Sequence, residues 1–132
     1  MDKEAASLKS QLQLPPILAD LGYSGMAWVG IDGAAEMLAA LEKQGQKLFA
    51  AYTPVNVAPD APGYDPRLKE LIPKLQGHGT VVWLVVNSNV YKPSSTEGDP
   101  RAVEILREIA DLAQQYGVNV SLYPHRGAYA ER

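Results

Sequence analysis

Apolar residues recur at two different spacings along the chain, and the two spacings alternate. Segments with apolar residues three or four positions apart have the period of a helix, and the short apolar runs between them have the length of a strand. The helices are expected to begin at Pro15 or Pro16, after Asp32, at Asp65-Pro66 and at Asp99-Pro100, and to end at Gly22, Gly45, Gly77 and Gly117. The strands are expected at 25–30, 47–52, 80–86 and 118–122.

This order of elements predicts a parallel sheet. Each expected helix ends in a glycine and is followed by a strand within about four residues, as in αβ connections. Alternating helices and strands build parallel sheets through right-handed crossovers. The unbroken apolar run Val81–Val86 predicts a strand that is covered on both faces. Four strands suit either a small open sheet or half of an eight-stranded barrel, which needs about 250 residues.

Prolines shape two of the expected segments. Thr53–Tyr64 contains Pro54, Pro59 and Pro62, and it is expected to be an ordered loop because it is too short and too apolar for a flexible tether. Pro73 lies inside the third helix and removes one backbone hydrogen bond. That helix is therefore expected to be kinked or short.

The C-terminal stretch Gly117–Arg132 carries the candidate chemistry. Pro124 cannot donate to a sheet ladder, so the last strand is expected to end near it. Tyr123, His125 and Arg126 then stand where a strand leads into a loop. In α/β proteins ligands bind at that end of the strands, so we expect a ligand site there.

Composition narrows the classes of function. Hydrophobic residues make up 46% of the 132 residues, enough for a core, and a net charge of -3 argues against a nucleic-acid or acidic-membrane surface. The sequence has no cysteine, which excludes disulfides and thiolate metal sites, and it has no Walker loop, GxGxxG or His-Glu-x-x-His motif. No apolar run approaches the ~18 residues that span a bilayer, and the N-terminus lacks the apolar centre of a signal peptide. A cytoplasmic protein is expected.

Three short stretches together resemble the sugar phosphate isomerase/epimerase family, whose members have a xylose isomerase-like TIM barrel. Leu18–Trp28 is similar to the family's helix-to-strand passage LGYDGIE. Ala102–Ala113, followed by Gly117-Val118, is similar to the helix before the mid-barrel strand, and Leu122–His125 looks like the end of that strand. The resemblance extends over roughly residues 15–132, and the order of the pieces is more specific than any one piece.

The resemblance implies that residues 1–132 form a single partial TIM-barrel domain of about four βα units, with parallel strands alternating with helices. The first and the last strands of the barrel would be missing. It also implies a divalent metal ion (Mn, Mg, Zn or Co) at the strand ends, commonly with a glutamate at the tip of the mid-barrel strand. Tyr123 occupies the place where that carboxylate is expected, and a phenol is a poor ligand for a hard metal.

His125 is the leading candidate for a catalytic or metal-binding residue. Imidazole titrates near neutrality, so at a strand tip it could bind a metal or act as a general acid or base. The alternative is a loop histidine that bonds a backbone carbonyl. His78 lies at the opposite, N-terminal end of a strand and is expected to be structural, because that face of a barrel serves stability.

Substrate binding is assigned to aromatic and polar residues near the strand ends. Trp28, Tyr52 and Tyr123 could form the floor of a sugar pocket, since flat aromatic faces suit the apolar faces of sugar rings, or they could be core packing. Asn87 could hydrogen-bond hydroxyl groups, or it could end its strand in a turn. Arg126 could hold a phosphate or carboxylate, or it could be a surface residue.

Three functions are left open by the sequence. The favoured one is a sugar phosphate isomerase/epimerase-like enzyme that, when its barrel is complete, carries out metal-assisted proton transfer on a small-molecule sugar or polyol. The second is a non-catalytic half-barrel that binds a sugar or a partner protein and closes as a homodimer through its open sheet edges. The third is a flavodoxin-like α/β domain, which is disfavoured because no phosphate-binding loop follows the first strand.

Overall fold

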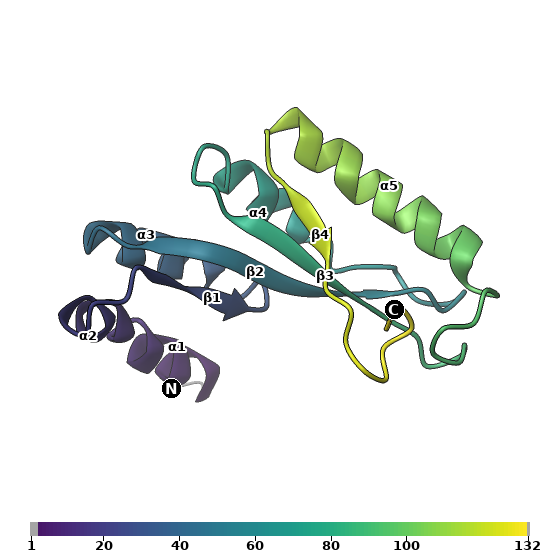
Figure 1. Ribbon diagram of the computed structural model, residues 1–132, viewed down its shortest axis with the longest axis horizontal. Coiled ribbons are helices and arrows are strands. Elements are labelled where there is room, and N and C mark those ends of the chain that lie inside the picture. Colours follow the sequence, from purple (N-terminus) through teal and green to yellow (C-terminus); the bar gives the residue numbers. More distant parts are fainter. Residues whose placement is uncertain (1–2, 132) are drawn as a thin grey trace.

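Four parallel strands alternate with helices in the computed structural model, which describes residues 3–131 (Figure 1). The elements are α1 (Lys3–Gln11), α2 (Leu14–Asp20), β1 (Gly25–Val29), α3 (Ala34–Lys43), β2 (Lys47–Asn56), α4 (Leu68–Lys74), β3 (Val81–Asn87), α5 (Asp99–Gln115) and β4 (Val120–Leu122). The strands are hydrogen-bonded in the order β1-β2-β3-β4, and every pair is parallel. The predicted alternation and the predicted parallel sheet are confirmed.

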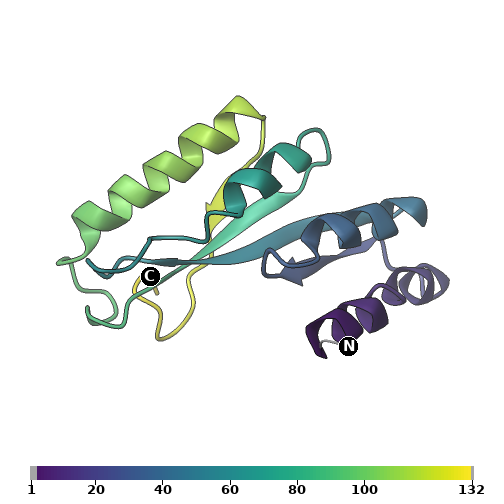
Figure 2. The same cartoon turned by 180° about the vertical axis from the view of Figure 1, so that it is seen from behind.

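Helices α3, α4 and α5 cover one face of the sheet, and α1 and α2 lie beside β1 (Figures 1 and 2). The core lies between the sheet and helices α3, α4 and α5. Its largest fully buried side chains include Met37 and Leu41 of α3, Leu48 of β2, Ile72 of α4 and Ile109 of α5. The opposite face of the sheet has no helical layer in the part of the chain described, and we call it the open face.

Strand β3 is not covered on both faces, contrary to the prediction from its apolar run. Val82, Leu84 and Val86 are at most 2% exposed and face the helices, whereas the alternate residues Val81 and Trp83 are only half-buried. A four-stranded sheet cannot curl round to cover its own second face. The apolar residues of that face are the ones that a closed barrel would enclose.

Strand β2 is longer than predicted, because residues 53–56 belong to it rather than to the following loop. Pro54 is tolerated there since β1 ends at Val29, opposite Tyr52, so the missing N–H lies on a free edge. The chain then folds back, and the Asn56 N–H donates to the carbonyl of Gly63 at 2.7 Å.

The expected ends of the helices are confirmed in part. Helix α4 has only 7 residues and contains Pro73, which agrees with the prediction of a short helix. Gly117, with a φ of 65°, ends the segment after α5 as expected. Asp32 does not cap α3, because Gly33 takes that position and no side chain caps the helix. Residues 3–131 include no helix with the length and hydrophobicity of a membrane span.

Candidate functional site

Three aromatic rings meet on the open face, and we call them the aromatic cluster. Tyr52 of β2 is paired with Trp83 of β3, and Tyr123 follows β4. The Tyr52 ring lies edge-on to both neighbours, with centroids 4.9 Å from Trp83 and 4.9 Å from Tyr123. Trp83 and Tyr123 are stacked, with centroids 5.5 Å apart and an interplanar angle of 22°. The rings therefore hold one another in fixed orientations.

The cluster combines flat apolar surface with phenol hydroxyls. Tyr123 is 36% exposed, and Tyr52 and Trp83 are half-buried, so solvent reaches the rings. A hydrogen bond to Tyr123, together with partial burial, raises the pKa of Tyr52 above its ordinary value. The Tyr52 phenol therefore stays neutral at physiological pH. Such a surface can stack on an apolar ring face and hydrogen-bond to hydroxyl groups beside it.

Two asparagines end the strands above this cluster. Asn56 and Asn87 are paired at the carboxyl ends of β2 and β3, and their positions alternate with those of Tyr52 and Trp83 so that all four belong to the open face. The Asn56 Oδ1 accepts the backbone N–H of Ala58 at 2.9 Å. This contact orients the Asn56 amide, whose nitrogen remains a hydrogen-bond donor.

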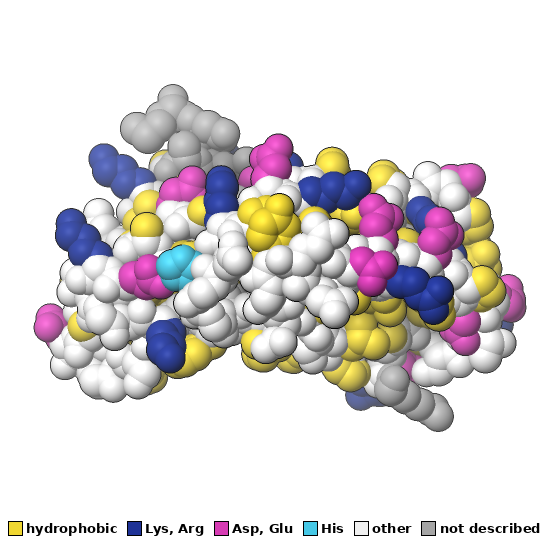
Figure 3. Space-filling view, turned by 90° about the horizontal axis from the view of Figure 1, so that it is seen from above, with side chains coloured by type: hydrophobic (Ala, Val, Ile, Leu, Met, Phe, Trp, Pro, Cys, Tyr) yellow, Lys and Arg dark blue, Asp and Glu magenta, His cyan; other side chains and the backbone are white. Residues whose placement is uncertain are grey.

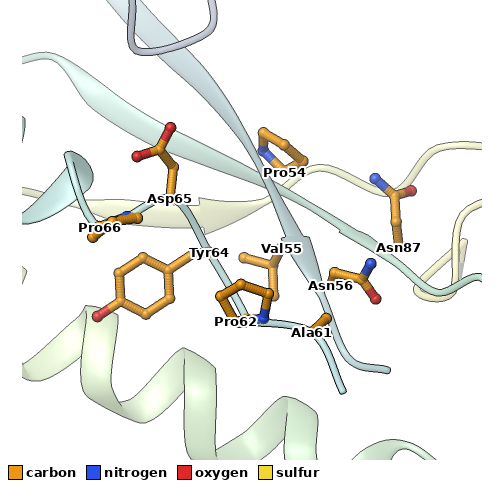
Figure 4. Close-up of a pocket in the computed structure, with 10 residues that line it drawn as sticks. Pro54, Val55, Asn56, Ala61, Pro62, Tyr64, Asp65, Pro66 and Asn87 are labelled. Atoms are coloured by element: carbon orange, nitrogen blue, oxygen red, sulfur yellow. The ribbon is translucent and has the colours of Figure 1, made fainter. Parts of the chain in front are cut away.

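A cavity of about 370 Å³ adjoins these asparagines. It lies at the carboxyl ends of the parallel strands, where such sheets bind ligands. Its walls include Pro54, Asn56, Pro62, Tyr64, Asp65 and Asn87. Figure 4 shows the amides of Asn56 and Asn87 at one end and the ring of Tyr64 toward the other. The wall is mostly apolar with a few convergent polar groups, which is the usual composition of a small-molecule site.

Arg67 forms ion pairs with two carboxylates near the strand ends. The Arg67 Nη2 donates to Asp65 Oδ2 at 2.6 Å, and its Nη1 bonds Asp32. Hydrogen bonds from Arg67 hold the pKa of Asp65 below its usual range. Asp32 follows β1 and Asp65 follows β2, and the two carboxylates are bound to the same guanidinium.

The residues described do not fit the divalent metal site that the resemblance implies. Residues 3–131 hold no group of three or more histidine, aspartate or glutamate side chains placed to bind one ion. His125 lies in the exposed loop after β4, where its Nδ1 is 3.0 Å from the backbone carbonyl oxygen of Arg126. Its ring centroid is 6.3 Å from that of Tyr123, so it stands next to the aromatic cluster.

The structure brings some of the predicted site residues together. Tyr52 and Tyr123 share the aromatic cluster, Asn87 lines the adjoining cavity, and His125 borders the cluster. Arg126 is exposed in the same loop as His125. His78, expected to be structural, pairs with Glu42 at the amino end of the sheet.

Trp28 lies apart from the aromatic cluster, in the core packing that the sequence left as its alternative role. It is 8% exposed, belongs to the core under the helices, and donates its indole N–H to the carbonyl oxygen of Asp32 at 2.7 Å. Trp83 takes its place, although the sequence analysis did not name it. Two-residue alternation in β3 would have indicated that Trp83 faces away from the buried Val82 and Leu84.

Comparison with known proteins shows the fold. No protein-family model and no curated protein matches the sequence. Among solved structures, the probable 3-DHS dehydratase AsbF of Bacillus anthracis is similar with a TM-score of 0.66 and 14% identity, over 88% of this chain and 47% of that one. A D-psicose 3-epimerase of Clostridium cellulolyticum is similar with a TM-score of 0.57 and 20% identity, over 85% and 46%.

A third similar structure is a sugar phosphate isomerase/epimerase of Parabacteroides distasonis, with a TM-score of 0.55 and 12% identity, over 87% of this chain and 46% of that one. The chain thus spans about half the length of the structures it matches. The predicted fold, about half of a xylose isomerase-like TIM barrel, is confirmed.

Proposed function

We propose that this chain binds the substrate of a sugar phosphate isomerase/epimerase-like barrel that acts on a sugar or polyol. The observation that carries the proposal is the aromatic cluster of Tyr52, Trp83 and Tyr123 on the open face. Carbohydrate rings have apolar C–H faces, which pack on flat aromatic surfaces. The amides of Asn56 and Asn87, four residues further toward the carboxyl ends of β2 and β3, supply donors and acceptors for hydroxyl groups.

The loop after β4 supplies the remaining groups of the proposed site. His125 stands beside Tyr123 and could move a proton next to a carbonyl, since imidazole titrates near neutrality. Arg126 would hold a phosphate or carboxylate group of the substrate. A metal ion would need ligands from outside the residues described, so no step of the reaction is assigned to one.

Calorimetric titration of the 132-residue chain with D-tagatose, a hexose phosphate and a linear polyol tests the proposal. We expect binding to at least one of the three, and a loss of affinity of about three- to tenfold in Trp83→Ala, because a stacked ring contributes about 0.5–1.5 kcal/mol. Phe49→Ala is the matched control, since Phe49 is an aromatic residue of the same strand face, 48% exposed, outside the cluster. Equal affinities of the two variants, or no binding at millimolar sugar, would contradict the proposal.

A non-catalytic half-barrel is the second candidate function. It is favoured by Tyr123, which stands where the resemblance implies a carboxylate, and by the absence of a metal-ligand group within residues 3–131. The two candidates differ in turnover. An isomerase or epimerase would interconvert a bound sugar when Mn, Mg, Zn or Co is supplied, and His125→Ala would reduce that rate more than the affinity. A non-catalytic protein would bind the sugar and leave it unchanged with every metal.

A further inference from the structure

One end of the structure exposes an apolar stripe on a helix. Leu14 and Ile17 of α2 and Leu21, its C-cap residue, lie three and four positions apart, and they are 37%, 52% and 68% exposed. Residues at this spacing share one side of a helix. We call these three residues the α2 stripe. A stripe of this kind on a helix that flanks a sheet normally packs against a neighbouring element.

The other end of the structure offers a groove. Its volume is about 300 Å³, and Ala110, Gln114, Val118 and Val120 are among the residues that line it, between α5 and β4. Val103, 52% exposed, lies one heptad before Ala110 and so extends the same side of α5. We call this surface the α5 groove.

The α5 groove points away from the rest of the helical layer. On the opposite flank of α5, the Glu108 carboxylate accepts a hydrogen bond from the Tyr64 hydroxyl at 2.7 Å and pairs with Lys69 of α4 at 3.2 Å. That flank is therefore occupied by α4. The groove lies where the next helix of a βα series would pack, beyond β4.

Both outer strands have an unpaired edge within the residues described, since β1 pairs only with β2 and β4 only with β3. Neither strand contains a charged residue or a proline, the features that usually protect an edge from pairing. Apart from Lys47 at its amino end, the described strand positions of the open face carry no charge. The surface over α4 and α5, in contrast, shows interspersed acidic and basic side chains (Figure 3).

We propose that the α2 stripe and the α5 groove are the two halves of one interface, which joins two copies of this chain into a closed eight-stranded barrel. In this dimer β4 of each copy pairs in parallel with β1 of the other, and α2 covers that junction from outside. The two junctions are related by a two-fold axis along the barrel, so a single kind of contact closes the ring. This inference does not depend on what ligand the barrel binds.

The number of strands and the order of the elements agree with this assembly. The four described strands of each copy together give the eight strands of a closed barrel. Each strand in the series is preceded by a helix, and α2 directly precedes β1, so in chain order it takes the place of a crossover helix between β4 of one copy and β1 of the other. The open face then becomes the barrel interior, which is packed with apolar side chains in such folds.

Sedimentation equilibrium of the 132-residue chain tests the assembly. We expect a species of twice the 14.3 kDa monomer mass. Ile17→Lys should weaken the dimer about tenfold or more, because it places a charge in an apolar contact that occurs twice. Val90→Lys, at a residue that is 60% exposed in the loop after β3, is the matched control and should leave the mass unchanged.

A folded monomer of the unaltered chain at about 100 μM, with its helical circular dichroism intact, would overturn the proposal, because dimers that close a fold form below such concentrations. So would a dimer that Ile17→Lys and Val90→Lys weaken equally. Both substituted residues are exposed, so each variant is expected to fold.

Cross-linking between copies tests the interface itself. The chain has no cysteine, so Ile17→Cys and Gln114→Cys can be labelled without background. When the two variants are mixed, a bismaleimide of about 10 Å, the distance between packed helix axes, should join them to each other. Ile17→Cys alone should give little cross-linked dimer, because the two α2 helices lie at different junctions. Efficient cross-linking of Ile17→Cys to itself, without the mixed product, would overturn the proposed arrangement.

Discussion

At the scale of single residues, the side of the strand decides which tryptophan can meet a ligand. Trp28 is paired with Ala51 and faces the helices, whereas Trp83 is paired with Tyr52 and faces the open side. Trp28 and Tyr52, which were predicted to share one site, thus lie on opposite faces of the sheet. Their separation has a local cause, because Phe49 is an extra residue in β2 between its pairings with Met26 and Ala27 of β1. Regular alternation from Leu48 would have turned Tyr52 toward the helices, and a bulge of this kind leaves no clear signal in one sequence.

The Tyr52 phenol gives a test of the aromatic cluster. Tyr123→Phe is expected to lower the pKa of Tyr52 toward 10.0, because the hydrogen bond with Tyr123 is the largest cause of its elevation. The stacked ring is retained in this variant. Tyrosine Cζ chemical shifts followed across an alkaline titration would measure the change. Tyr116→Phe, outside the cluster, is the control, and an unchanged Tyr52 titration in Tyr123→Phe would contradict the described contact.

At the scale of elements, the boundaries that depend on local signals were predictable, and those that depend on distant partners were not. Gly117 and Pro73 act within their own segments and gave correct expectations for α5 and α4. Asp32 has the residue type of an N-cap, yet its carboxylate pairs with Arg67, 35 positions along the chain. Such a pairing depends on the parallel arrangement of β1 and β2, which places the segments after them side by side.

The contact between α4 and α5 predicts an acid-sensitive term in stability. Hydrogen bonds from Tyr64 and Lys69 lower the pKa of Glu108 below 4.5. A carboxylate with a lowered folded-state pKa stabilises the protein above its unfolded pKa, and this contribution is lost as the pH falls through the folded value. Glu108→Gln should therefore lower the free energy of unfolding by up to about 1 kcal/mol at neutral pH, a small effect because the pair is exposed. In acid the same substitution should leave the free energy of unfolding unchanged.

Urea denaturation at about pH 7 and about pH 3 would measure this difference. Asp111→Asn, on the solvent side of the same helix and outside this contact, is the matched control variant. The pH dependence of stability that comes from the Tyr64 phenol has the opposite sign, because burial and the contact with Glu108 raise its pKa to about 12. The stabilisation from the Tyr64 phenol is complete below pH 10 and is lost as the pH rises through the folded-state value of about 12. A Glu108→Gln effect of equal size at both acidities would contradict the assignment.

At the scale of the whole molecule, the sequence predicted the half-barrel but not how it is layered. The four helix–strand units follow from periodicity, whereas the apolar run of β3 suggested helices on both faces. A strand inside a barrel and a strand between two helical layers bury both faces alike, so their sequences are indistinguishable. The cavity beside Asn56 and Asn87 was also beyond reach, because the back-folded segment 57–64 forms one wall.

Hydrogen exchange gives a test at this scale. If two copies close a barrel, amide protection in β1 and β4 should rise with protein concentration, because their outer edges gain partners. Protection in β2 and β3, which are paired on both sides at every concentration, should stay constant and serves as the internal control. Protection that is independent of concentration in all four strands, starting from dissociated chain, would contradict strand pairing between copies.

The segment after β4 is attached to β3 at both of its ends. The Tyr123 N–H donates to the Leu84 carbonyl at 2.9 Å, and the Ala130 N–H donates to the Val86 carbonyl at 3.2 Å. Tyr129 is 6% exposed and its hydroxyl bonds Asp99, which secures the second attachment. Residues 124–129 are thus a short span fixed at both ends to β3. Because such a span samples few conformations, His125 and Arg126 would lose little configurational freedom in binding the proposed ligand.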